Sequence, residues 1–120
     1  MSRAIGLLLA AALMAACGSS GLNLQVTSTP CITAGQLVTI TIMTSPGAEL
    51  DWQVQDDFGG ELNPKISPVT TDSGGKATVT WQSPSQLSTT TLHFLLTAKK
   101  DTARASRDIH VAVGGNGRAC

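Results

Sequence analysis

Short runs in which apolar and polar residues alternate one by one constrain the fold of this chain most. The clearest runs are QLVTITIMT at 36–44 and ELDWQVQ at 49–55. Successive side chains of a β-strand point to opposite faces, so each run predicts a strand with one face in a core and the other in water. The residues expected to point inward are Val38, Ile40, Ile42, Leu50, Trp52 and Val54.

The same alternation recurs later in the chain and predicts further strands at 76–82, 90–98 and 106–113. Their inward residues would be Ala77, Val79, Trp81, Leu92, Phe94, Leu96, Ile109, Val111 and Val113. A first strand at 22–29 and a short one between Glu61 and Val69 bring the expected number to seven. Pro, Gly, Ser and Asp separate the runs and no long helical period appears, so we expect an all-β fold.

Four segments resemble the bacterial immunoglobulin-like and PKD-like domain families: AGQLVTITI, LDWQVQ, TTDSGGKATVTWQSP and the closing IHVAV. The resemblance implies an immunoglobulin-like antiparallel β-sandwich of about seven strands over 22–120, ending in a Gly-rich tail. It also implies a scaffold or binding role, because these motifs mark a fold and carry no catalytic residues. The inter-sheet disulfide of antibody domains has no counterpart in the predicted second and sixth strands.

The start of the chain has the three parts of a secretory signal. Arg3 supplies the positive charge, an apolar stretch follows, and Ala15 and Ala16 precede Cys17. At about 13 residues the apolar run is too short for a transmembrane helix, which needs about 20. We therefore expect residues 1–16 to be a signal peptide.

Leu13 to Cys17, LMAAC, resembles the lipobox of bacterial lipoproteins and departs from it mildly at Met14. The resemblance implies that Cys17 becomes the N-terminus and carries acyl chains such as palmitate, which anchor the protein in the cell envelope. Gly18 does not fit the inner-membrane retention signal of such proteins, so an outer membrane is favoured where one exists. Residues 17–21 would then be the lipidated cysteine and a short Gly/Ser tether, in which Gly18 to Gly21 span about 11 Å. Plain secretion with a stray thiol at Cys17 is the alternative.

Three cysteines in an exported protein leave one unpaired unless one has another role. With Cys17 lipidated, Cys31 and Cys120 remain as a pair for an oxidising compartment. In an immunoglobulin-like sandwich the first and last strands run parallel, which brings both residues to the same end. Two free thiols, or an intermolecular bond through Cys120, are the alternatives.

Two histidines are expected to face each other on the outside of the sheet. A hairpin turn at Asp101 and Thr102 sets His93 opposite His110, where two imidazoles can share a metal ion or respond to pH. A structural metal site usually has three or four protein ligands, and only Asp108 is an obvious third. Polar surface histidines without a metal are therefore the default expectation, and no cofactor is expected.

Other candidate sites have simpler interpretations. Calcium could be held by the carboxylates of Asp56, Asp57, Glu61 and Asp72, but their spacing matches no calcium loop and suits ordinary turns. Trp52 and Trp81 continue the inward phase of their strands, so core packing is expected rather than carbohydrate stacking.

Composition excludes several classes of function. Eight basic residues balance eight acidic ones without a basic stripe, which argues against nucleic-acid binding. The chain has no G-x-S-x-G, H-E-x-x-H or Gly-rich phosphate loop, so we expect no enzyme activity.

The sequence thus favours a non-enzymatic envelope lipoprotein that is anchored to the membrane by lipid. Its domain would be a structural or protein-interaction accessory of another envelope protein, docking beside the membrane through exposed edge strands. The alternative is a surface-exposed, adhesin-type module that binds a ligand through loops such as Ser45 to Ala48 or Ser83 to Ser88.

Overall fold

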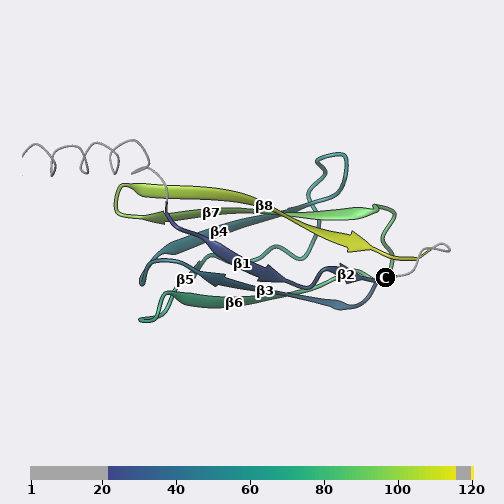
Figure 1. The fold of residues 1–120 in the computed structure, drawn as a ribbon. Coiled ribbons are helices and arrows are strands. Elements are labelled where there is room, and N and C mark those ends of the chain that lie inside the picture. The colour runs from purple at the N-terminus through teal and green to yellow at the C-terminus, as the bar shows by residue number, and fades with distance from the viewer. Residues whose placement is uncertain (1–21, 116–119) are drawn as a thin grey trace, which may run out of the picture.

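A computed structural model describes residues 22–115 and Cys120, and the described residues contain strands and loops but no helix (Figure 1). The expected signal peptide, Cys17 and the tether lie outside this part of the chain. The strands are β1 (Gln25–Ser28), β2 (Cys31–Ile32), β3 (Leu37–Met43), β4 (Glu49–Gln55), β5 (Val69–Thr70), β6 (Lys76–Gln82), β7 (Thr91–Lys100) and β8 (Ala103–Val113).

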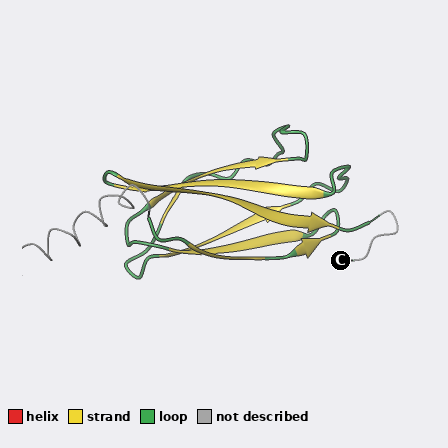
Figure 2. Cartoon of the chain, turned by 45° about the horizontal axis from the view of Figure 1, so that its top comes forward, coloured by secondary structure: helices red, strands yellow, loops and turns green. Residues whose placement is uncertain are grey.

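The strands form two sheets that lie face to face (Figure 2). One sheet has three strands in the order β1-β3-β6, and the other has five in the order β2-β8-β7-β4-β5. A single cluster of buried apolar side chains draws on both sheets. Trp81 of β6 and Phe94 of β7 join them directly, with ring centroids 5.4 Å apart at 83°. The protein is therefore all-β, with two layers compatible with a β-sandwich.

The alternation of apolar and polar residues along the sequence correctly predicted which side chains form the core. All the residues expected to point inward are buried, except Ala77, which is half-buried. The β7–β8 hairpin has the predicted register, with His93 opposite His110. Trp52 and Trp81 are both in the core, as expected.

Two strand predictions need correction. The predicted strand at 22–29 starts only at Gln25, and after Pro30 the chain changes sheet to pair as β2 with β8. Proline has no N–H to donate, which ends the first ladder and lets the second begin. The short strand expected between Glu61 and Val69 is reduced to one bridge at Glu61 and the two residues of β5, because Pro64 and Pro68 each remove a donor.

The two packed sheets have two ends, at which the strands turn or finish. Leu22 lies at the first, here called the entry pole, where its N–H donates to the carbonyl of Arg104 beside the β7–β8 turn at 3.0 Å. The opposite end, the far pole, holds the loop 56–60 after β4, the start of β7 and the end of β8 (Figure 1). The ten residues of β7 run from one pole to the other, which separates the two poles by about 30 Å.

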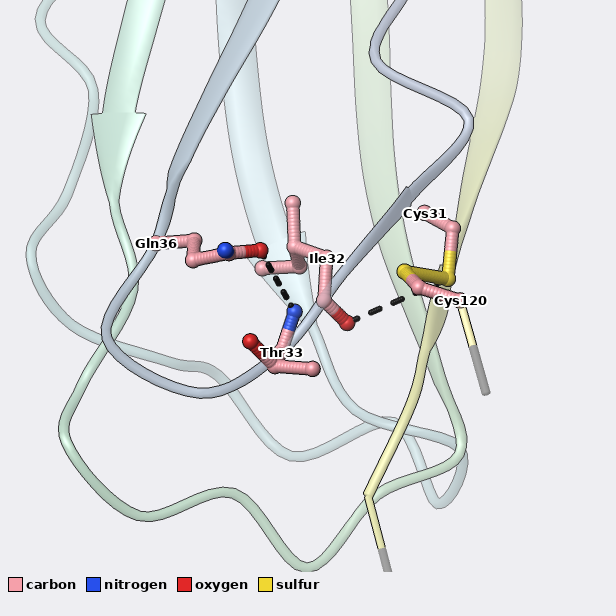
Figure 3. Close-up of a disulfide and its surroundings, with 5 residues drawn as sticks. All are labelled: Cys31, Ile32, Thr33, Gln36 and Cys120. Atoms are coloured by element: carbon pink, nitrogen blue, oxygen red, sulfur yellow. Dashed lines mark hydrogen bonds between the residues drawn. A yellow bond between two sulfur atoms is a disulfide. The ribbon is translucent and has the colours of Figure 1, made fainter. Parts of the chain in front are cut away.

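A disulfide closes the far pole, and it is the predicted one. Cys31 and Cys120 are bonded with their Cα atoms 5.5 Å apart (Figure 3). Cys31 lies in β2, which runs parallel to β8 with Cys31 opposite Ala112. The bridge therefore fastens Cys120 to β2, the strand beside which β8 ends.

Candidate functional site

Two histidines stand side by side on the outer face of the five-stranded sheet, near the far pole. His93 of β7 and His110 of β8 are direct cross-strand partners. Their sequence neighbours Phe94 and Ile109 are buried, so the strand alternation turns both imidazoles outward. The ring centroids are 4.6 Å apart and the planes meet at 70°.

Asp108 connects the two imidazoles. It precedes His110 by two residues in β8 and so shares the same face. One carboxylate oxygen lies 3.3 Å from Nδ1 of His93, and the other lies 3.2 Å from Nε2 of His110. Sequence reasoning named Asp108 as the third candidate ligand, and the structure brings the three together.

A second carboxylate reaches His93 from the loop after β4. Oδ1 of Asp57 lies 3.5 Å from Nε2 of His93. Its Oδ2 accepts hydrogen bonds from the backbone N–H of Thr90 at 2.9 Å and from the Thr90 hydroxyl at 2.8 Å. The Thr90 backbone N–H is the main cause that holds the pKa of Asp57 well below its usual range, because it stabilises the ionised form. The ring of His93 therefore lies between two carboxylates.

The same loop presents an aromatic side chain to solvent. Asp56 Oδ1 accepts hydrogen bonds from the backbone N–H groups of Phe58 and Gly60, each at 2.8 Å. The backbone N–H of Asp57 donates to the Thr89 hydroxyl at 3.0 Å. Phe58, held between these contacts, is 92% exposed.

We call residues 56–60 the Phe58 loop; it belongs to the connection that projects between β4 and β5 in Figure 1. The sequence analysis did not predict this exposed loop. The available signal was DDFGG, an aromatic residue flanked by turn formers in a chain with few aromatics. It also missed Thr89 and Thr90, whose contacts with the loop are tertiary.

The four carboxylates considered for calcium do not come together. Asp72 lies in the turn before β6 at the entry pole, where its Oδ1 accepts hydrogen bonds from the backbone N–H groups of Gly74 and Lys76. Asp56 braces the Phe58 loop at the far pole, and Glu61 pairs with Lys65 at 3.6 Å. Asp56 and Asp72 therefore form turns, as the alternative interpretation of the sequence held.

Comparisons with known proteins do not assign this chain to a family. No protein-family model matches this chain, and no curated protein matches it. The described residues also include no helix that is both long and apolar enough to cross a membrane.

Proposed function

We propose that this chain is a non-enzymatic, membrane-anchored envelope lipoprotein whose immunoglobulin-like domain docks a protein partner through the Phe58 loop. The exposure of Phe58 carries this proposal. The other aromatic residues, Trp52, Trp81 and Phe94, are buried, whereas Phe58 is 92% exposed. Large aromatic side chains are the common anchors of protein interfaces.

The loop is braced before any partner arrives. Asp56 holds the backbone N–H groups of Phe58 and Gly60, and Asp57 fastens the loop to Thr90, the residue before β7. Binding loses less free energy to loop ordering when the loop is already in one conformation. An exposed aromatic side chain on a braced loop backbone therefore favours docking into a partner's pocket.

The immunoglobulin-like identity is supported by the strand order. With β1, β3 and β6 taken as strands A, B and E, and β4, β7 and β8 as C, F and G, the two sheets have the division typical of that fold. Trp52 of β4 occupies the place of the buried tryptophan on strand C. The loops of such sandwiches cluster at the two ends, and the Phe58 loop lies at the end opposite the β3–β4 and β7–β8 connections, which correspond to the B–C and F–G loops.

The proposed anchor rests on the lipobox-like sequence before Cys17. Leu22, a few residues after that cysteine, lies at the entry pole. A lipid on Cys17 would therefore hold the entry pole toward the membrane and turn the Phe58 loop away from it. The partner is then expected to meet the end of the domain that faces away from the bilayer.

Photo-crosslinking in the native cells tests the docking proposal. A photoreactive amino acid replaces Phe58 in the full chain, and in a matched protein it replaces Met43, which is 40% exposed at the entry pole. We expect a discrete protein adduct from position 58 and none of that size from position 43. Equal adducts from both positions, or none from position 58, would contradict the proposal.

Fractionation tests the anchor separately. The wild-type chain is expected in the membrane and detergent phases, and Cys17→Ser in the soluble phase, since two or three acyl chains hold a protein stably in a bilayer. A Cys17→Ser protein that still partitions with membranes would contradict lipid anchoring and leave the docking test unaffected.

A further inference from the structure

We infer that His93, Asp108 and His110 form a binding site for a late first-row divalent transition-metal ion such as Zn²⁺. The inference stands independently of the proposed docking role of Phe58. One ligand atom from each residue can be chosen so that all lie within 4.8 Å of one another. Two imidazole nitrogens and a carboxylate oxygen are donors that suit such ions, whereas calcium and magnesium prefer oxygen alone.

The present distances are close to those of a metal site. With metal–ligand distances of about 2.0 to 2.2 Å, two ligands of a tetrahedral ion lie roughly 3.4 Å apart. Oδ1 of Asp108 lies 3.3 Å from Nδ1 of His93, and its other oxygen, Oδ2, lies 3.2 Å from Nε2 of His110. Ligand atoms within 4.8 Å of one another must move closer to share one ion, and rotation of these side chains on the paired β7–β8 hairpin can bring them there.

Histidines that bind a metal through one ring nitrogen usually donate the N–H of the other ring nitrogen to a carboxylate or carbonyl. Asp57 can accept this hydrogen bond from His93. If Nδ1 of His93 binds the ion, its Nε2 carries the proton and faces Oδ1 of Asp57 at 3.5 Å. A carboxylate that accepts this proton fixes the tautomer and orientation of the ring. Asp57 is suited to this role because Thr90 holds its other oxygen with two hydrogen bonds. The arrangement is a carboxylate–histidine–metal relay that an incidental pair of surface histidines does not require.

Three protein ligands leave a fourth position of a tetrahedral ion open. The side chain of His110 is 58% exposed and that of Asp108 is 49% exposed, so the open position faces solvent. Water, or a side chain of another protein, can complete the coordination.

Calorimetric titration of the metal-free full chain in detergent with Zn²⁺ at neutral pH tests the inference. We expect saturable binding of one ion per chain and none of comparable affinity for Mg²⁺ or Ca²⁺. His110→Ala and Asp108→Asn should abolish binding at concentrations that saturate the wild type. Asp51→Asn, a change on the neighbouring β4 outside the cluster, should leave it unchanged.

Asp57→Asn separates the outer contact from the ligands themselves. It should retain one-to-one binding with an affinity weakened about 10- to 100-fold. All variants are compared only after circular dichroism shows the same β-structure as the wild type. No one-to-one Zn²⁺ binding by the wild type, or a His110→Ala protein that binds as tightly, would overturn the inference.

Discussion

The indole N–H of Trp81 donates a hydrogen bond to the carbonyl of Pro64 at 2.6 Å. Trp81 is a core residue of β6, and Pro64 belongs to the connection that returns from the Phe58 loop to β5. The bond therefore fixes the exposed connection to the core. Trp52 differs, because its indole nitrogen is buried and has no partner within the described part of the chain.

Because the Trp81 indole has a hydrogen-bond acceptor and the Trp52 indole has none, substitution by phenylalanine should destabilise the protein more at position 81 than at position 52. Trp81→Phe removes a donor and leaves the Pro64 carbonyl unpaired, whereas Trp52→Phe removes a donor that has no acceptor. Both lose packing, but Trp81→Phe should lower the free energy of unfolding by about 1 to 2 kcal/mol more. Urea unfolding of the two variants measures the difference, and equal losses would show that the Pro64 bond contributes little.

Thr90→Val should loosen the Phe58 loop without unfolding the sandwich. The change removes the hydroxyl that donates to Asp57 at 2.8 Å and keeps the backbone bond. Amide hydrogen exchange should become severalfold faster at 57–60 and stay unchanged in β3. Thr97→Val, on the outer face of β7, is the control. Unchanged exchange in the loop would mean that Thr90 does not brace it.

Removal of the disulfide should cost much of the stability of the domain. Cys31 and Cys120 are separated by 89 positions, and closing so long a loop restricts the unfolded chain by about 4 to 5 kcal/mol on the chain-entropy model. The Cys31→Ser/Cys120→Ser protein should therefore unfold at much lower urea concentration than the oxidised wild type. Reduction of the wild type should give the same shift, and a shift in only one of the two experiments would contradict the stabilising role of the disulfide.

Gly75 should tolerate alanine far less well than Gly35. Both have positive φ, +81° and +89°, which costs alanine about 1 to 2 kcal/mol. A Cβ at Gly75 would also collide with the backbone carbonyl of Thr44, whereas one at Gly35 meets nothing within 4 Å. Gly75→Ala should therefore lose more than about 3 kcal/mol. Thermal unfolding compares the two, and similar losses would mean that the turn shifts freely.

Strand alternation predicted the core because burial follows from side-chain parity. Parity together with a turn placed at Asp101 and Thr102 predicted the register that sets His93 opposite His110, and the structure pairs them. The errors in the predicted strand boundaries also have a physical cause. Proline at 30 and 64 interrupts ladders that the apolar pattern would extend, and the sequence pattern alone does not say where a strand changes sheet.

The Phe58 loop could not be found by the same rule. Phe58 has the even numbering of the inward residues of β4, so alternation gives no reason to expect it in solvent. The turn braced by Asp56 breaks that phase. The contact of Asp57 with Thr90 joins positions 33 residues apart, and such side-chain contacts depend on the folded loop rather than on any local pattern.

The central claim is that Phe58 anchors a partner, and native electrophoresis of membranes solubilised in mild detergent tests it most directly. The wild-type chain should migrate in a complex larger than itself, and Met43→Ala should do the same. Phe58→Ala, which removes an exposed side chain and leaves the core intact, should migrate as the free protein. A Phe58→Ala protein that remains in the same complex as the wild type would contradict the account.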